Sequence, residues 1–80
     1  MKIENLCANC MREMRNPDGA CEFCGFDIRT FNLPRNHMSP FSILAGKYLI
    51  GNSIGEGGFG ITYIGMDLNL EVRVAIKEYY

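Results

Sequence analysis

Residues 54–60 read Ile-Gly-Glu-Gly-Gly-Phe-Gly, and residues 61–64 continue as Ile-Thr-Tyr-Ile. The first stretch contains the pattern G-x-G-x-x-G, which alone fits more than one kind of nucleotide-binding loop. A dinucleotide-binding fold needs a helix directly after the glycines, so that the helix N-terminus meets the pyrophosphate. Residues 60–66 are instead rich in β-branched side chains, which favour a strand. The pattern therefore predicts two strands joined by a glycine-rich turn, and a dinucleotide-binding unit is the weaker alternative.

Three strands are predicted around this turn. They cover residues 48–54, 60–66 and 72–77, with a turn over residues 67–71. Short connections between successive strands favour an antiparallel meander. No segment of this half has the period of an amphipathic helix. In the third strand, alternation places Ala75 and Lys77 on one face and Val74 and Ile76 on the other. The fold class expected is mainly β.

The third strand reads Val-Ala-Ile-Lys at residues 74–77, at the spacing from the glycines that protein kinases use. With both motifs, residues 46–80 resemble the start of a bacterial serine/threonine protein kinase domain. The lead-in Leu-Ala-Gly-Lys-Tyr at residues 44–48 is also similar to that family. The resemblance implies the first three antiparallel strands of a kinase-like N-lobe, which is one part of an α+β kinase fold.

The resemblance also implies an ATP site. The backbone of the glycines would approach the ATP phosphates, Phe59 would shield them from water, and Lys77 would contact the α- and β-phosphates. Ile54 and Ala75 match the apolar contacts of adenine, and Thr62 stands where the family pattern has Val. The nucleotide-binding residues expected are Ile54, Gly55, Glu56, Gly57, Gly58, Phe59, Gly60, Thr62, Ala75 and Lys77.

Phosphoryl transfer needs groups beyond this site. A kinase also uses a helix-borne Glu paired with the lysine, an H-R-D loop and a D-F-G Asp that binds Mg²⁺. The sequence contains none of them, and Glu78 points to the face opposite Lys77. We therefore expect an N-terminal fragment that is inactive alone, with no catalytic residue. The full-length protein would phosphorylate Ser or Thr of a protein substrate from Mg·ATP.

The four cysteines form two hooks, Cys7-x2-Cys10 and Cys21-x2-Cys24. Two such hooks complete a tetrahedral all-thiolate shell with no open position, which predicts a structural zinc site. Two disulfides are an alternative that a reducing cytoplasm disfavours. A redox-active pair needs a βαβ context that is absent here. Iron in a rubredoxin-like centre stays open, because an all-thiolate shell does not choose between the metals. Some kinases of the family also resemble this chain in carrying a short zinc ribbon.

The chain divides on composition into a zinc ribbon at 1–26, a linker at 27–45 and the start of the kinase domain at 46–80. The linker contains Pro34 and Pro40 and has neither strand nor helix periodicity. We expect its apolar residues to dock on the rest of the chain. These residues are Phe31, Leu33, Phe41 and Leu44. His37, the only histidine, is expected to be solvated.

Charge and hydropathy exclude several kinds of partner. Eight Lys and Arg face nine Asp and Glu, and zinc on four thiolates would take the formal charge to -1 - 4 + 2 = -3. Nucleic acid is therefore an unlikely partner, because binding it takes a cationic surplus. No apolar run approaches the length of a membrane span, and the N-terminus lacks the apolar core of a secretory signal. The expected location is the cytoplasm. The alternative function is a non-enzymatic zinc-ribbon interaction module.

Overall fold

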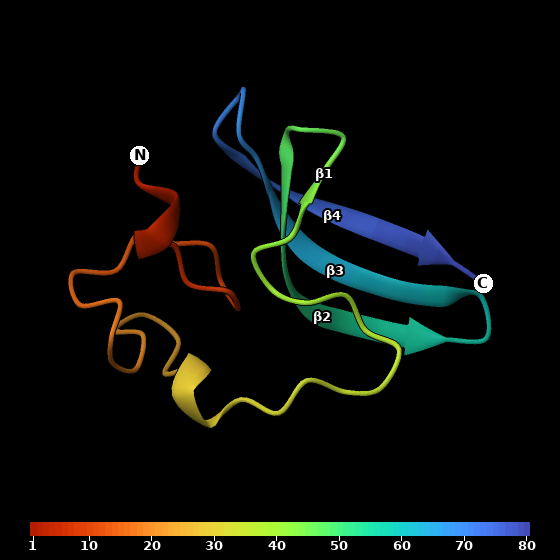
Figure 1. Cartoon of the computed structure of the whole chain (residues 1–80), viewed down its shortest axis with the longest axis horizontal. Helices are drawn as coiled ribbons and strands as arrows, with labels where there is room; N and C mark the ends of the chain where they lie inside the picture. Colours follow the sequence, from red (N-terminus) through yellow and green to blue (C-terminus); the bar gives the residue numbers. More distant parts are fainter.

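The computed structural model describes all 80 residues (Figure 1), and its main element is one antiparallel sheet. The strands are β1 (Ile43–Leu44), β2 (Tyr48–Gly57), β3 (Gly60–Asp67) and β4 (Val72–Tyr79), in the spatial order β1-β2-β3-β4. The expectation of a mainly β fold is confirmed, and β2, β3 and β4 contain the three predicted strands. Two 3-10 turns, η1 (Ile3–Asn5) and η2 (Ile28–Thr30), complete the elements. Since both are single turns, the structure offers no candidate for a transmembrane helix.

Strand β1 was not predicted, and it lies inside the segment that was expected to be a linker. Ile43 pairs with Leu49, and Leu44 pairs with Tyr48. The connecting residues Ala45 and Gly46 both have positive φ, at 52° and 69°. Lys47 completes the three-residue connection, and its N–H donates to the Leu44 carbonyl at 3.0 Å. Two successive positive φ values inside such a turn match the twist of an antiparallel hairpin. A two-residue strand is too short to show alternation, so no pattern could indicate it.

The turn between β3 and β4 is set by the buried side chain of Asp67. Its Oδ1 accepts the N–H of Asn69 at 2.9 Å and the N–H of Leu70 at 3.0 Å. An aspartate that accepts backbone N–H groups further along the chain stabilises a tight turn. The predicted turn at residues 67–71 is found here.

The two faces of the sheet are covered by different parts of the chain. On one face, Leu49 and Met66 pack against Leu6 and Met11 of the N-terminal residues. On the other, Ile50, Ile61 and Tyr63 form a second cluster. Linker residues Met38 and Leu44 and the β4 residue Ile76 pack against that second cluster. The sheet therefore lies between the cysteine-containing N-terminus and the linker.

Docking of the linker is thus observed, but only some of the expected residues take part. Leu44 joins the cluster on the sheet, and the ring of Phe31 packs on Phe26 with centroids 5.4 Å apart. Leu33 and Phe41 stay 44% and 39% exposed. The division at residues 26 and 45 remains a prediction.

Candidate metal centre and glycine hairpin

The four cysteine sulfurs meet at one point of the N-terminal residues 1–26, called the cysteine module below. All four Sγ atoms lie within 4.8 Å of one another. Cys7 and Cys24 are 3.6 Å apart at sulfur, and Cys10 and Cys21 are 3.8 Å apart. A tetrahedral shell with metal–sulfur bonds of about 2.3 Å has sulfur–sulfur edges of about 3.8 Å. The cysteines form no disulfide. They are positioned to hold a metal ion, and the set is compatible with Zn²⁺.

Each hook is preorganised by its own backbone, and the two hooks are alike. The N–H of Asn9 donates to the Cys7 sulfur at 3.3 Å, and the N–H of Phe23 donates to the Cys21 sulfur at 3.4 Å. N–H groups aimed at a sulfur stabilise the thiolate, which is the form that binds a metal. In the folded chain both hooks therefore stabilise the thiolate form that a metal ion requires.

Each hook closes at a residue with a left-handed backbone. Met11 follows the first hook with φ 63°, and Gly25 follows the second with φ 80°. Their N–H groups donate to the carbonyls of Cys7 and Cys21, both at 2.8 Å. Glycine adopts this conformation without a steric penalty, so Gly25 was a usable sequence signal. Met11 gave no such signal because a bulky residue rarely adopts positive φ.

The thiols differ in how readily they ionise. Burial raises the pKa of Cys7 to about 12 and also raises the pKa of Cys10. At Cys24 desolvation again opposes ionisation, but hydrogen bonds outweigh it and lower the pKa to about 7. The main donors are the Phe26 backbone and the Asn9 side chain, whose Nδ2 lies 3.7 Å from the Cys24 sulfur. A metal must displace the remaining protons, so acid favours its release.

The cysteine module sits on β2 through direct backbone contact. The N–H of Asn52 donates to the Ala8 carbonyl at 2.7 Å, and the Asn52 side chain donates to Asn9 Oδ1 at 3.1 Å. Gly51 faces the module, where an added Cβ would overlap the Ala8 carbonyl oxygen and lie 2.5 Å from Met11 Cε. Only glycine allows so close an approach. The metal centre is thus linked to the strand that leads into the glycines.

The glycine hairpin, residues 54–62, has the strand–turn–strand geometry that its sequence predicted. Gly57 pairs with Gly60 across a two-residue turn at Gly58 and Phe59. Gly60 has φ 145°, and an added Cβ there would overlap the Glu78 carbonyl oxygen. The ring of Phe59 lies at the tip, half exposed, with its centroid 6.5 Å from that of Tyr79. No helix follows the glycines, which excludes the arrangement of a dinucleotide-binding fold.

The strand register brings several of the predicted site residues to one face of the sheet. Thr62 lies opposite Gly55 of β2 on one side and opposite Lys77 of β4 on the other. Residues directly opposite each other in an antiparallel ladder project from the same face. Ala75 and Lys77 were predicted to share one face of this strand, and both are exposed, while Val74 and Ile76 are half-buried. We call this line the Gly55–Thr62–Lys77 row.

Ile54 does not join this row in a regular way. It lies where the β2–β3 register shifts, between Ser53 and Gly55, and its side chain is 58% exposed. An extra residue of this kind breaks the alternation that would fix its face. The structure therefore leaves Ile54 uncovered at the edge of the row and does not pack it into an apolar wall.

The opposite face of the glycine hairpin is held by the linker. The Glu56 carboxylate pairs with His37 Nε2 at 2.9 Å and accepts a hydrogen bond from Tyr80 Oη at 2.8 Å. The contact with His37 and then that with Tyr80 lower the pKa of the Glu56 carboxyl. The His37 side chain is only 6% exposed, so the expectation of a solvated histidine is wrong. Glu56 is paired with Ile61, which places its carboxylate on the face away from Lys77. The linker thus fastens one of the predicted site residues.

Sequence reasoning missed these contacts because each joins residues far apart in the chain. His37 and Glu56 are separated by nineteen positions, and Tyr63 reaches back to the linker at Met38. Isolated polar residues in an irregular segment carry no period and no motif spacing. The closest signal was the apolar content of the linker, which indicated docking but not its partners.

Comparisons of the chain with protein-family models, with curated proteins and with solved structures give no match. The fold and the site define a small, mainly β protein with a four-stranded antiparallel sheet and four cysteines positioned to hold a metal ion. Any finer assignment has to be argued from the residues themselves.

Proposed function

We propose that this chain is the ATP-binding N-terminal portion of a serine/threonine protein kinase that carries a zinc ribbon. The observation that carries the proposal is the Gly55–Thr62–Lys77 row, which aligns the two sequence motifs across three adjacent strands. The row shares its face with Met66, which packs on the cysteine module, but at the row itself Gly55 and Lys77 are exposed. A glycine-rich turn next to a lysine at this register suits a phosphate chain, because the backbone can approach closely and the ammonium offers positive charge. ATP and Mg²⁺ are the ligands proposed for this face.

The charge distribution around the row supports an anionic ligand. Lys77 forms no ion pair in the structure, and the carboxylate nearest in sequence to the glycines, Glu56, is held on the other face. A free ammonium beside glycine backbone attracts phosphate, whereas a carboxylate on the same face would repel it. Transfer to a protein Ser or Thr needs a catalytic base and a Mg²⁺-binding Asp from elsewhere. This chain alone is therefore expected to bind nucleotide without transferring phosphate.

The test is titration of the metal-loaded chain with a fluorescent ATP analogue in Mg²⁺. Lys77→Ala should weaken saturable binding by about tenfold, the effect of losing one well-placed charge contact of about 1.4 kcal/mol. Arg73→Ala is the matched control, because Arg73 is also exposed and lies on the same strand and face as Lys77. Equal affinities of the two variants, or no saturable binding by the parent chain, would refute the assignment.

We propose zinc as the metal of the cysteine module, in a structural role. Four thiolates leave no position for a substrate, and a module of 26 residues has little apolar core of its own. Iron is the alternative that the same ligands allow. Elemental analysis of the purified chain should give one zinc per chain. An iron content of one, with a coloured rubredoxin-like centre, would replace zinc in this assignment.

A second candidate function is a non-enzymatic interaction module built on the metal centre. The observation that favours it is an apolar cavity that borders Cys7 and lies on the side of the module formed with the linker. This function does not require nucleotide, and both functions can coexist in one protein.

A further inference from the structure

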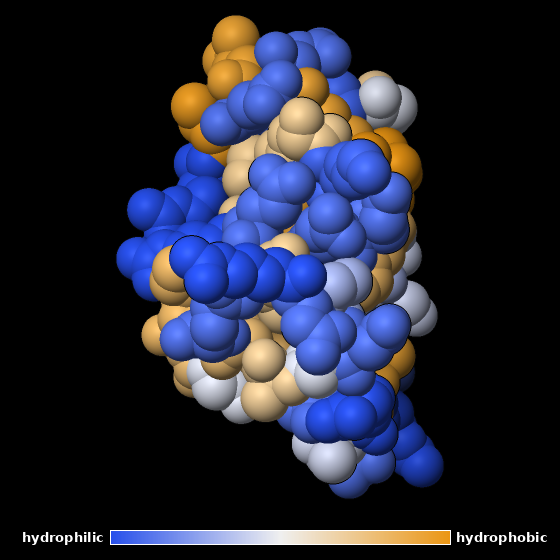
Figure 2. Space-filling model, turned by 90° about the vertical axis from the view of Figure 1, so that its left-hand side faces the viewer, coloured by the Kyte–Doolittle hydropathy of each residue, from blue (hydrophilic) through white to orange (hydrophobic).

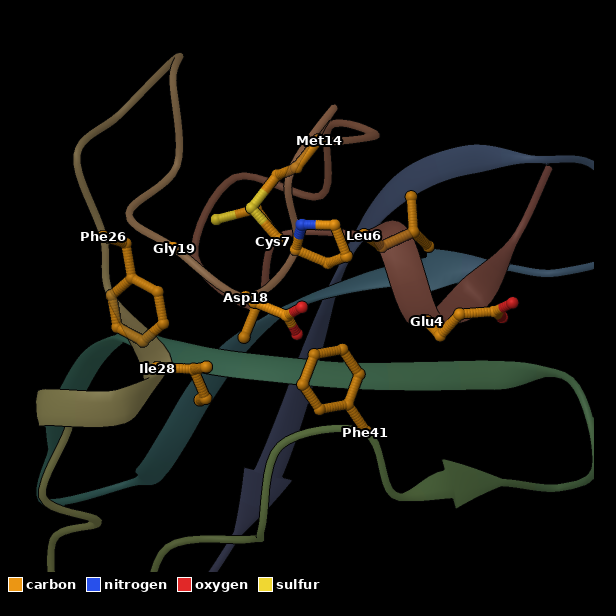
Figure 3. A pocket seen from close by; sticks show the side chains of 11 residues that line it. Glu4, Leu6, Cys7, Met14, Asp18, Gly19, Phe26, Ile28 and Phe41 are labelled. Atoms are coloured by element: carbon orange, nitrogen blue, oxygen red, sulfur yellow. The ribbon is translucent and has the colours of Figure 1, made fainter.

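A cavity of about 310 Å³ lies where the linker passes the cysteine module (Figure 3). Its apolar wall combines three separate parts of the chain. Leu6, Met14 and Phe26 come from the module, Ile28 from the start of the linker, and Phe41 from its far end. A second hollow next to it, lined by only three residues, shares Glu4 and Phe41 and extends the groove to Ile3. Ligand cavities begin at about 300 Å³, so this cavity is large enough for one or two side chains.

Phe41 is presented to this groove by its backbone. Its φ is 69°, and its N–H donates to the Ile50 carbonyl at 2.7 Å. A bulky residue at positive φ is uncommon and is kept only where the surroundings enforce it. The ring remains 39% exposed and does not join the apolar cluster on the sheet. The linker therefore holds an aromatic surface open toward the module.

The charged residues that line the groove are both acidic. Glu4 and Asp18 contribute carboxylates, and no Lys, Arg or His is among the lining residues. Neither carboxylate has an ion-pair partner. Asp18 lies between Phe26 and Glu4 in the close-up, with the ring of Phe41 beside it (Figure 3).

The arginines of the neighbouring chain segments form their ion pairs with other carboxylates, although the charge of Asp18 also contributes to raising the pKa of Arg29. Arg15 pairs with Glu22 at 3.5 Å, and Arg29 pairs with Asp27 at 2.6 Å. The groove is thus apolar on its walls and negative at its rim. This charge disfavours nucleic acid and anionic membrane surfaces and favours a cation.

We propose that the groove binds a peptide segment of a partner protein, which inserts one bulky apolar side chain and places a flanking Lys or Arg against Glu4 and Asp18. The inference rests on the second proposed function, the interaction module, and not on nucleotide binding. The side of the molecule that Figure 2 shows is mostly hydrophilic, with hydrophobic residues in separate patches. A short anchored segment suits such a surface better than a broad apolar interface does.

The test uses the full metal-loaded chain and short fluorescein-labelled peptides that differ only at their centre. Lys-Phe-Lys and Lys-Leu-Lys peptides should bind saturably in fluorescence polarisation. Lys-Ser-Lys should bind about tenfold more weakly or worse because it lacks the apolar anchor. Glu-Phe-Glu should also lose affinity by repulsion from the acidic rim. Added salt should weaken the Lys-Phe-Lys peptide, since its charge contacts are exposed.

Charge-neutral variants locate the binding site. Glu4→Gln and Asp18→Asn should each weaken the Lys-Phe-Lys peptide by about two- to fivefold. Glu71→Gln removes the same charge at an exposed position in the β3–β4 turn, outside the groove, and should leave binding unchanged. Metal content and far-ultraviolet circular dichroism verify that each variant is folded. Equal effects of all three variants, or equal binding of Glu-Phe-Glu and Lys-Phe-Lys, overturn the proposal.

Two further outcomes separate this proposal from the others. If the chain forms a dimer that Phe41→Ser abolishes, the groove is a contact between two copies and the peptide proposal is wrong. In amide NMR spectra, peptide should shift the signals of Asp18 and Ile28, whereas ATP should shift those of Gly55 and Lys77. If peptide shifts its expected signals and ATP does not, only the nucleotide-binding function is absent. If ATP shifts its signals and peptide does not, only the peptide-binding function is absent.

Discussion

At the scale of single residues, Tyr63 shows how one side chain can join three segments. The residue is fully buried in β3, packed with Ile50 and Ile61. Its hydroxyl accepts the N–H of Met38 at 2.9 Å and donates to Glu78 Oε1 at 3.0 Å. The hydroxyl therefore satisfies a linker N–H group and a carboxylate of β4 at once. Burial of a tyrosine without such partners would cost free energy.

Tyr63→Phe should destabilise the chain by about 1–3 kcal/mol, because the Met38 N–H and the Glu78 carboxylate would lose their shared partner while the ring still fills its site. Tyr79→Phe is the matched control, since Tyr79 is 70% exposed and its hydroxyl has no hydrogen-bond partner. Chemical denaturation of the metal-loaded chain measures both. Equal free energies of unfolding for the two variants would show that the hydroxyl contributes nothing.

For single residues, the sequence predicted some positions correctly and others wrongly. The cluster of four cysteines was predicted correctly, because two CxxC hooks are the spacing that brings four thiolates to one metal ion. Gly25 after the second hook has the positive φ that glycine signals, whereas Met11 in the equivalent position after the first hook carries no such signal. His37 was misjudged because its burial comes from a pairing with Glu56 that no local pattern encodes. Residue type and spacing carry local chemistry, whereas long-range partners come only from the fold.

At the scale of elements, β2 connects the proposed metal centre to the glycines. Its first half contacts the cysteine module at Gly51 and Asn52, and its second half enters the glycine hairpin. The register with β3 shifts twice between Ile50 and Gly55, directly after the contact with the module. Irregularities of this kind redirect side chains along a strand. The position of the module and the shape of the hairpin are therefore set on the same strand.

Gly51→Ala should separate the module from the strand. The new Cβ would overlap the Ala8 carbonyl, which is backbone and cannot rotate away, so a loss of about 1–3 kcal/mol is expected. Gly55→Ala is the matched control: an added Cβ there meets nothing within 4 Å, and stability should change by no more than about 1 kcal/mol. Hydrogen exchange of the Asn52 amide should accelerate in Gly51→Ala alone. Unchanged protection of that amide would contradict the role given to Gly51.

Element prediction succeeded where the pattern was long and failed where the element was short. Strands β2, β3 and β4 each span eight or more residues and show β-branched enrichment or alternation. Strand β1 has two residues, and η1 and η2 have three each. Elements this short are determined by tertiary contacts, here by pairing with β2 and by the cap that Asp27 provides to Arg29 N–H. Local composition therefore cannot specify them.

At the scale of the whole molecule, the chain lacks a second layer of regular structure and uses irregular segments in its place. The cysteine module packs against one face of the sheet and the linker packs against part of the other. In Figure 1 the module lies to the left of the sheet, and the linker runs from it below β2. A chain this small buries too little apolar surface for a core to suffice alone. The largest cluster on the module side consists of Leu6, Met11, Leu49 and Met66, half of it from the module. The sheet and the metal-binding module should therefore depend on each other.

Metal removal tests this dependence. A chelator at neutral pH should unfold the module, since its own core is little more than Met14 and the buried cysteines. Exposure of Leu49 and Met66 should then lower the thermal midpoint of the sheet, and amide signals of both parts should change together.

Lowering the pH should release the metal in the same way, because protons reoccupy the thiolates; the raised pKa values of Cys7 and Cys10 favour this direction. The β4 amides belong to an edge strand that pairs only with β3, so they report on the sheet. If their spectrum and thermal midpoint persist while the module unfolds, the two parts fold independently, and the covering role of Leu6 and Met11 is refuted.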